Sequence, residues 1–282
     1  AALLLGLAIP LAILYVIEIL NTSIRGRKDL EENLTIPFLG EVPLHKGTSD
    51  HGIVVRENST DPVSESMRII RSNMSFMKVQ SERMQSVTSS NPSAGKTFIS
   101  SNLAMSLAMT DKRVILIDFD LRRRTLSKEF GQRHARKGLS SYLAGTFTEL
   151  DDIIFNSNMH ANLDIIYAGP QPPNPAEMLL SEKLDKMIAE LKKRYDYVII
   201  DAVPALMVAD AQIIDRLADL TIYVVREGLL DRRQLPDIER LYTTGRFHNM
   251  SVVLNGATAQ SGYGYRHGYG YGYGYGYATE KV

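Results

Sequence analysis

The chain has 282 residues, which is enough for one α/β domain with appended segments. Its 32 Lys and Arg residues balance its 32 Asp and Glu residues, so no net basic charge favours nucleic acid, and partners have to be sought in local features. The absence of cysteine excludes a disulfide framework and a thiolate metal site, and is typical of a reducing compartment such as the cytoplasm.

The first segment is apolar and uncharged from Ala1 to Ile17, and Arg25, Arg27 and Lys28 follow it. A spanning helix needs roughly 20 mostly apolar residues, and basic residues usually mark its cytoplasmic end. We therefore expect a transmembrane helix over residues 1–21, then a juxtamembrane linker over residues 22–60; a buried soluble helix is the alternative. Because the sequence starts inside the apolar run without Met, we expect a longer protein with a membrane and periplasmic region upstream.

Short β-rich segments alternate with helical ones through the middle of the chain. The β-rich segments, such as VILID and YVIID, are apolar throughout, which is typical of parallel strands buried on both faces. The alternation predicts a doubly wound, mainly parallel α/β sheet in a domain over residues 61–260. We expect strands over residues 114–118, 163–167, 197–201, 220–225 and 251–254, and helices over residues 97–109, 176–194 and 206–217.

The segment SSNPSAGKT, from Ser89 to Thr97, lies between a short β-like stretch and a helix, where a phosphate-binding loop belongs. Backbone amides of such a loop point at phosphate oxygens, Lys96 adds a charge near the β- and γ-phosphates, and the Thr97 hydroxyl can ligate Mg²⁺. The common form, GxxxxGK[ST], has Gly where this chain has Ser90. We predict an ATP and Mg²⁺ site of the P-loop NTPase type; a plain turn at Gly95 is the alternative.

Three carboxylates follow buried strands: Asp118 and Asp120 end VILIDFD, and Asp201 ends YVIID. Because open α/β sheets bind ligands at the carboxyl ends of their strands, we expect all three to converge on the nucleotide. One carboxylate there can hold Mg²⁺, and another can accept a proton from an attacking hydroxyl. A single Asp at a strand end more often caps the next helix, so the prediction depends on finding three.

The last segment, residues 261–282, nearly alternates Gly and Tyr and contains half of the chain's 14 tyrosines. It cannot build a core, because Gly at every second place costs backbone entropy and buries nothing, so a disordered tail is expected. Its tyrosines in the Gly/Tyr stretch are Tyr263, Tyr265, Tyr269, Tyr271, Tyr273, Tyr275 and Tyr277.

Taken together, these segments resemble the bacterial tyrosine kinases of the polysaccharide co-polymerase type, which are membrane autokinases. The resemblance covers nearly the whole chain. The matching segments, in order, are the apolar span, Ile36–Pro43 (IPFLGEVP), Glu65–Arg71 (ESMRIIR), the loop, Ile117–Asp120 with Arg122, Pro172–Glu182 (PPNPAEMLLSE), the strand of Asp201 and the tyrosine-rich end.

The resemblance implies Lys96, Asp118 and Asp120 as catalytic residues, and Thr97, Asp118, Asp120 and Asp201 as metal ligands. We assign the proton acceptor to Asp118 and the metal mainly to Asp120 and Asp201, although these roles can be exchanged. The expected nucleotide-binding residues are Pro92, Ser93, Ala94, Gly95, Lys96, Thr97, Phe98 and Asn255.

The same resemblance implies that the chain phosphorylates its own tail tyrosines in trans within a homo-oligomeric ring, with an octamer as one candidate. Glu65, Arg68 and Arg71 are implied to contact the neighbouring subunit; an exposed helix with an i,i+3 salt bridge is the alternative. The implied location is the bacterial inner membrane, with the kinase domain and tail in the cytoplasm. The implied partners are the machinery that polymerises and exports a capsular or exopolysaccharide, and a cognate tyrosine phosphatase, but no nucleic acid.

Two departures from the family pattern keep other functions open. Ala202 and Val203 stand where the family usually has Thr and Pro, so a hydroxyl near the metal is missing, and the tail is an extended Gly-Tyr repeat. One alternative is a membrane-associated partitioning-type ATPase, although such proteins usually carry an extra lysine early in the loop, and Ser89–Asn91 has none. The other is a catalytically weak nucleotide-binding scaffold.

Overall fold

The computed structural model describes residues 10–13, 15–16, 20–47, 49–77, 84–132, 134–206 and 210–258. Within these ranges, no helix is long and apolar enough to cross a membrane. Most of the transmembrane segment expected over residues 1–21 lies outside the described residues, and so does the whole tail with its seven tyrosines.

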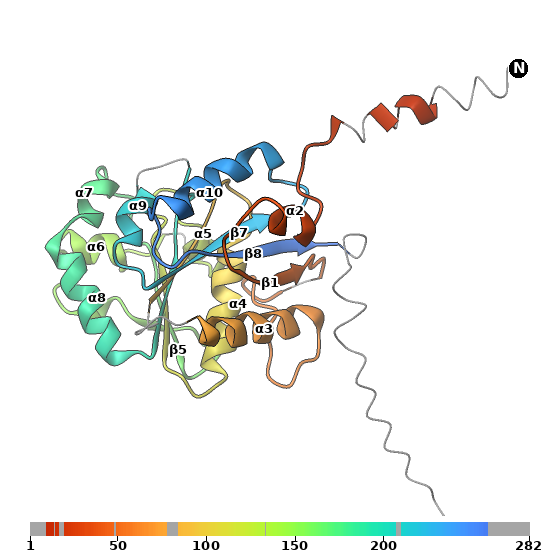
Figure 1. Ribbon diagram of the computed structural model, residues 1–282. Coiled ribbons are helices and arrows are strands. Elements are labelled where there is room, and N and C mark those ends of the chain that lie inside the picture. The colour runs from red at the N-terminus through yellow and green to blue at the C-terminus, as the bar shows by residue number, and fades with distance from the viewer. Residues whose placement is uncertain are drawn as a thin grey trace, which may run out of the picture.

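A single mixed sheet forms the centre of the described part of the chain, with the strand order β1-β8-β7-β2-β6-β3-β5-β4 (Figure 1). Neighbouring strands are parallel except for the antiparallel pair of β4 with β5. The mainly parallel α/β sheet expected from the apolar runs is confirmed. The strands are β1 (Phe38–Pro43), β2 (Met84–Ser89), β3 (Val114–Asp118), β4 (Phe155–Asn156), β5 (Leu163–Ile166), β6 (Tyr197–Asp201), β7 (Leu220–Arg226) and β8 (Ser251–Ala257).

Helices cover both faces of the sheet, and each face has its own buried apolar cluster. One cluster joins the sheet to α3 and α4, and the other joins it to α8, α9 and α10. The helices are α2 (Arg27–Glu31), α3 (Pro62–Phe76), α4 (Lys96–Ala108), α5 (Thr125–Glu129), α6 (Leu139–Leu143), α7 (Pro175–Leu179), α8 (Glu182–Arg194), α9 (Asp210–Asp215) and α10 (Leu235–Thr243), with 3-10 turns at Leu150–Asp152 and Arg232–Gln234.

The helix expected over residues 176–194 is instead two helices, α7 and α8. Ser181 separates them with an extended backbone, and its hydroxyl accepts a hydrogen bond from the Leu184 amide at 3.4 Å, as an N-cap does. The helix expected over residues 206–217 is described only as α9, because residues 207–209 lie outside the described ranges. The expected strands and the helix over residues 97–109 are found, with ends that shift by up to three residues.

Part of the expected linker packs into the core of the sheet. Strand β1 pairs with β8, and Ile24, Leu39 and Val42 are almost completely buried. The boundary near residue 60 stays a prediction, but residues 38–43 are an edge strand of the same sheet that holds the loop.

A second part of the linker, residues 50–55, lies against the helices beside the loop; we call it the linker strap. The buried Asn102 on α4 holds it, since its Oδ1 accepts from the amides of Val54 at 2.8 Å and Val55 at 3.1 Å. Its Nδ2 donates to the Gly52 carbonyl at 2.9 Å and to the Phe98 carbonyl at 2.8 Å. All of the hydrogen-bonding capacity of this buried amide is therefore used, and three of the four bonds go to the linker strap.

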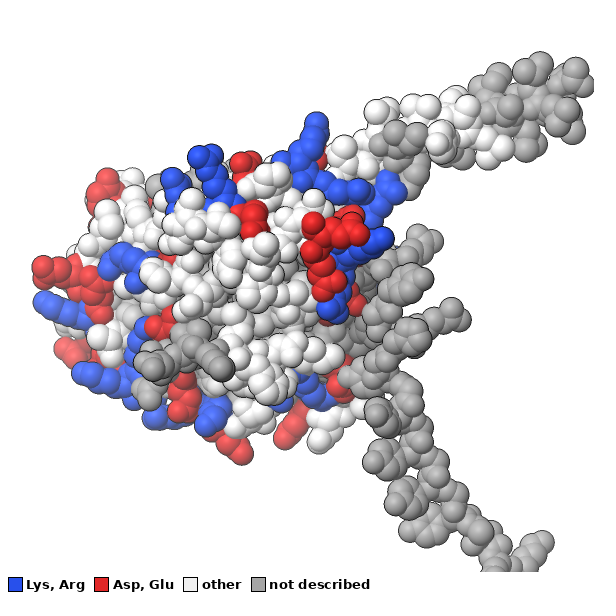
Figure 2. Space-filling model, viewed as in Figure 1, with Lys and Arg blue, Asp and Glu red and all other residues white. Residues whose placement is uncertain are grey.

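On the face that Figure 2 presents, charged side chains are not gathered by sign. Figure 2 shows Lys and Arg interspersed with Asp and Glu over the face it presents. This distribution agrees with the equal numbers of basic and acidic residues in the sequence.

Candidate active site

The predicted phosphate-binding loop connects β2 to the first residue of α4. Gly95 precedes the helix with a φ of 92°, in the left-handed region that glycine adopts without strain. A Cβ at this position would lie 2.0 Å from the Nδ2 atom of Asn255 on β8. That amide donates to the Ala94 carbonyl at 2.8 Å, so the last strand of the sheet helps to fix the shape of the loop.

Ser90, which replaces the usual first glycine of the motif, is buried beneath the loop. Its hydroxyl lies 2.9 Å from the hydroxyl of Tyr223, a fully buried side chain on β7. Burial raises the pKa of Tyr223, so the phenol is neutral and able to share a proton with Ser90. The serine therefore has a hydrogen-bond partner on the side of the loop that faces the core.

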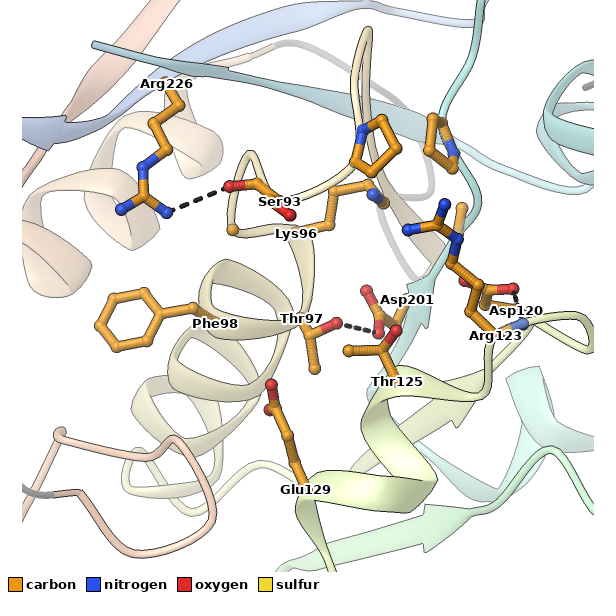
Figure 3. A pocket seen from close by; sticks show the side chains of 14 residues that line it. Ser93, Lys96, Thr97, Phe98, Asp120, Arg123, Thr125, Glu129, Asp201 and Arg226 are labelled. Carbon is orange, nitrogen blue, oxygen red and sulfur yellow. Dashed lines mark hydrogen bonds between the residues drawn. The ribbon is translucent and has the colours of Figure 1, made fainter. Parts of the chain in front are cut away.

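A cavity of about 360 Å³ opens in front of the loop (Figure 3). Lys96, Thr97, Asp120 and Asp201 line it, as do Pro92, Ser93, Gly95 and Phe98. Most of the sequence-predicted nucleotide residues are thus brought together. Asn255 and Phe98 line an adjoining hollow of about 140 Å³, which shares Gly95, Phe98 and Arg226 with the first.

Thr97 and Asp201 meet at the floor of the cavity. The Thr97 hydroxyl donates to Asp201 Oδ2 at 2.7 Å, while Asp201 Oδ1 is buried and has no hydrogen-bond partner among the described residues. Burial raises the pKa of Asp201 well above its usual value, and the nearby charge of Asp118 raises it further. An unsatisfied buried carboxylate oxygen beside a hydroxyl suits a divalent cation, because hard cations prefer oxygen ligands.

The charge of Lys96 is also destabilised by its surroundings. Burial lowers the pKa of Lys96, the charges of Asp201 and Asp120 act to raise it, and the charge of Arg123 acts to lower it. An incoming phosphate group would add negative charge and so stabilise the charged form of the lysine.

Asp118 and Asp120 are two residues apart in the chain but differ in their surroundings. Asp118 is fully buried. Its Oδ2 accepts two hydrogen bonds from Ser127, one from the amide at 2.9 Å and one from the hydroxyl at 2.6 Å. Its Oδ1 accepts a hydrogen bond from the Asp120 amide at 3.1 Å. Burial is the largest cause that raises the pKa of Asp118, to about 7. Asp120 lines the cavity, whereas Asp118 lies behind it, paired in register with Asp201.

Mg²⁺ would find only part of its coordination in protein side chains. Across the described ranges, no group of three or more His, Cys, Asp or Glu side chains is arranged to hold a metal ion. Mg²⁺ in nucleotide sites commonly uses one or two carboxylates together with waters and phosphate oxygens. Thr97, Asp201 and Asp120 have the oxygen chemistry for this, and the metal role of all four predicted ligands stays a prediction.

The residues expected at a subunit interface make contacts within their own chain. Arg68, which is half-buried, forms an ion pair with the half-buried Glu65 of α3 and donates to the Ser59 carbonyl at 2.6 Å. Arg71 donates to the carbonyl and the hydroxyl of Ser106, which ties α3 to α4. These contacts leave the interface role a prediction, and they add an internal packing role for Arg71.

Six residues that the sequence analysis did not single out as nucleotide or catalytic residues also line the cavity: Arg123, Thr125, Glu129, Ala202, Pro204 and Arg226. Arg123 lies in the turn after β3 and Thr125 begins α5, so their closeness to the carboxyl end of β3 could have indicated both. Arg226 ends an apolar strand on the same edge of the sheet, which is a similar signal. Glu129 lies one helical turn after Thr125, and burial raises its pKa, but its sequence context gives no sign of this position.

Known proteins share both the sequence and the architecture. The family described as AAA domain matches residues 83–228. The tyrosine-protein kinase YwqD of Bacillus subtilis is 36% identical over 195 residues, which cover 68% of this chain and 81% of YwqD. The tyrosine-protein kinase wzc of Salmonella typhimurium is 36% identical over 205 residues, which cover 72% of this chain and 27% of wzc.

Solved structures extend the same likeness to the fold. The kinase domain of the Escherichia coli tyrosine kinase ETK matches with a TM-score of 0.73 and 29% identity, over 86% of this chain and 98% of that domain. The chain spans about a third of the length of the first curated relatives that it matches. The resemblance drawn from the sequence is confirmed: the chain belongs to the family of bacterial tyrosine-protein kinases.

Proposed function

We propose that the chain transfers the γ-phosphoryl group of ATP to tyrosine hydroxyls, including those of its own tail. The observation that carries the proposal is the meeting of Lys96, Thr97, Asp120 and Asp201 around one cavity at the carboxyl edge of the sheet. The relatives are named tyrosine-protein kinases, which supports tyrosine as the acceptor. In this reaction a bond forms between the tyrosine oxygen and the γ-phosphorus. The bond between the γ-phosphorus and the β,γ-bridging oxygen breaks, and ADP leaves with the electron pair of the broken bond.

Each residue has a distinct task in this reaction. The loop amides and Lys96 bind the phosphates, and Thr97, Asp201 and Asp120 hold Mg²⁺, which when bound neutralises phosphate charge. A free tyrosine has a pKa near 10, so a carboxylate that accepts its proton assists the attack. Asp118 remains our assignment for this base, and the position of Asp120 at the cavity wall makes it the other candidate.

The adjoining hollow is suited to the rest of the nucleotide. Phe98 and Asn255 offer an aromatic face and an amide there, and the Arg226 guanidinium, which donates to the Ser93 carbonyl at 3.1 Å, lies between the two cavities. We propose that the phosphates occupy the larger cavity and that the base and ribose extend toward Asn255.

The tail is the proposed acceptor and the proposed switch. A Gly-rich segment of 22 residues has a root-mean-square reach of roughly 25 Å, which is enough to enter a neighbouring subunit's cavity in a ring. Each phosphotyrosine adds about −1.5 to −2 charges at pH 7, so several modified tails in one ring would repel each other. We propose that this repulsion loosens a ring formed through α3, and that a tyrosine phosphatase reverses the change.

The wider setting is also proposed. We infer attachment to the inner membrane through residues 1–21, a linker that leads to a cytoplasmic kinase domain, and control of the polymerisation and export of a capsular or exopolysaccharide. Two observations support this reading: the apolar first segment, and a family that includes the Salmonella kinase wzc.

One incubation tests the proposed activity. The 282-residue chain is purified, treated with a phosphatase, and incubated with ATP and Mg²⁺, and phosphotyrosine is mapped by mass spectrometry. Phosphotyrosine among the seven tail positions is the expected result. ATP hydrolysis without phosphotyrosine would indicate the partitioning-type ATPase instead, and nucleotide binding with neither reaction would indicate the scaffold.

Ring formation through α3 has its own test. Replacing Glu65 and Arg68 by Ala should lower the molar mass of the assembly measured by light scattering. Arg71→Ala is measured separately, because Arg71 is a predicted interface residue that also bonds to Ser106, so its loss combines an interface effect with weaker α3–α4 packing. An oligomeric parent whose mass is unchanged in the double variant would rule out the interface role.

A further inference from the structure

Three consecutive arginines follow β3, and the structure gives them different partners. The Arg122 guanidinium binds the buried Asp210 carboxylate with two hydrogen bonds, at 2.8 and 3.3 Å. Arg124 donates to the Gly169 carbonyl at 3.4 Å. The Arg123 guanidinium has no hydrogen bond or ion pair with any described residue, although it lines the cavity. Only this arginine of the three is therefore available to a ligand in the cavity.

Hydrogen bonds hold the backbone of Arg123, whereas its guanidinium makes none with the described residues. The Arg123 amide donates to Asp120 Oδ1 at 2.7 Å, and the Arg124 amide donates to the Asp120 carbonyl at 2.7 Å. These bonds anchor the turn to the carboxylate that faces the cavity. Figure 3 shows the guanidinium directed toward the amine of Lys96, across the space in front of the loop.

Besides Lys96, the cations that line the cavity are Arg123 and Arg226, and the Arg226 guanidinium already donates to the Ser93 carbonyl at 3.1 Å. Phosphoryl transfer spreads negative charge over three equatorial oxygens, and the loop supplies a single lysine, since Ser89–Asn91 carries no cation. A guanidinium is always charged and presents a planar fork of donors that fits two phosphate oxygens. Arg123 therefore has the charge and geometry to bind oxygens that Lys96, a point charge, leaves unbound.

We propose that Arg123 contacts the γ-phosphoryl group during transfer and stabilises the charge that develops on its oxygens, within the same chain that binds the ATP. This inference rests on the proposed phosphoryl transfer. The arginine takes no proton: the phenol proton passes to a carboxylate at the strand ends, and ADP leaves with the electron pair of the broken bond. Arg122 and Arg124 hold the turn, and Arg123 acts on the substrate.

Two substitutions and a control test the proposal. Arg123→Gln removes the charge, Arg123→Lys keeps it without the planar fork, and Arg136→Gln removes a charge from an exposed arginine that does not line the cavity. At saturating ATP, Arg123→Gln should slow phosphotyrosine formation by about 100- to 1000-fold, with a change of less than about threefold in the ATP concentration for half-maximal rate. Arg123→Lys should recover part of the rate, and Arg136→Gln should match the parent.

A binding measurement separates this role from a merely structural one. ADP with fluoroaluminate and Mg²⁺ mimics the phosphoryl group in transfer and needs no acceptor tyrosine. Arg123→Gln should bind ADP as the parent does and melt at the same temperature, but lose the extra affinity that fluoroaluminate gives. A rate within about threefold of the parent, or an equal loss of affinity for ADP, would overturn the proposal.

The two proposals fail in different ways. If the parent forms phosphotyrosine and Arg123→Gln forms it equally fast, the role of Arg123 is wrong and the kinase activity stands. If no phosphotyrosine forms, but Arg123→Gln abolishes the gain in affinity with fluoroaluminate, the tyrosine acceptor is wrong and the contact of Arg123 with the transferred group stands.

Discussion

The side-chain nitrogen of Asn255 occupies the space that a Cβ of residue 95 would need. The two residues lie 160 positions apart in the sequence, at the end of the last strand and at the end of the loop. The glycine is therefore required for two reasons, its left-handed backbone and its contact with Asn255. Gly95 permits a close approach that lets a distant strand support the phosphate-binding loop.

Gly95→Ala should weaken nucleotide binding by at least about tenfold. An alanine in the left-handed region costs about 1 to 2 kcal/mol, and its Cβ would push against the Asn255 amide. Isothermal titration with ADP measures the affinity. Gly245→Ala is the control, because Gly245 has a φ of 64° and no atom within 4 Å of the position of an added Cβ. Equal ADP affinity in the two variants would show that the contact with Asn255 does not matter.

Lys96→Met should abolish tyrosine phosphorylation without lowering the melting temperature. The lysine is the loop's point charge for phosphate, and a drop of at least about 100-fold in rate is expected when that charge is lost. Burial disfavours the charged form of Lys96, so an apolar side chain of similar length does not weaken the fold. Phosphotyrosine mapping and thermal unfolding give the two readouts, with exposed Lys112→Met as the matched control. Phosphotyrosine retained in a preparation free of other kinases would contradict the role.

Asn102→Leu should destabilise the domain by roughly 2 to 4 kcal/mol, measured by urea unfolding. The substitution leaves the amides of Val54 and Val55 without their acceptor, so hydrogen exchange at both should also accelerate. Ser101→Ala is the neighbouring control: its hydroxyl is buried and has no hydrogen-bond partner among the described residues, so its removal should change stability by less than about 1 kcal/mol. Unchanged exchange at Val54 and Val55 would mean that the linker strap is held by other contacts.

Asp61→Ala should cost about 1 kcal/mol at pH 7, because the carboxylate caps α3 by accepting from the amides of Val63 and Ser64, both at 3.0 Å. Burial acts to raise the pKa of Asp61, but hydrogen bonds from Ser64, Ser59 and Val63 outweigh it and hold the pKa below its usual value. A carboxyl group whose pKa is lower in the folded than in the unfolded state stabilises the fold. This stabilisation is fully present above the unfolded pKa, near 3.9, and is lost as the pH falls through the folded pKa.

The difference between the parent and Asp61→Ala should therefore shrink below about pH 4. Urea unfolding at pH 7 and pH 3 measures it. Asp61→Asn keeps a capping oxygen without a titrating group, so its stability relative to the parent should rise as the pH falls. A cost of Asp61→Ala that is the same at both pH values would contradict the cap.

The parts of the site that depend on local sequence could be predicted. Lys96 and Thr97 occupy fixed places in a motif between a strand and a helix, and Asp201 ends a continuous apolar run. The different surroundings of Asp118 and Asp120 could not be predicted, because both end the same apolar run. Asp118 is the last residue of β3 and accepts hydrogen bonds from Ser127, whereas Asp120 precedes the turn at residues 121–123 and lines the cavity. Their places at the end of the strand, rather than any difference in residue type, distinguish the two carboxylates.

Tertiary packing also explains the remaining differences in the fold. The helical spacing of apolar residues continues across Ser181, so one long helix was expected, and the break is visible only from the hydroxyl that caps α8. Strand β1 includes Gly40 and Pro43, which are poor strand formers, and it owes its conformation to its pairing with β8. Arg123 stands beside two other arginines, and only their partners in space show which of them faces the cavity.

The pairing of β1 with β8 has a mechanical consequence. These two strands are the first and the last of the sheet in the described part of the chain, and they lie parallel, in register pairs from Phe38 with Val252 to Pro43 with Ala257. A force applied between the residues before β1 and those after β8 pulls the two strands in opposite directions along their length. Their hydrogen bonds then bear the load together, in shear, rather than opening one at a time, so this edge of the domain should resist tension between its entering and leaving segments.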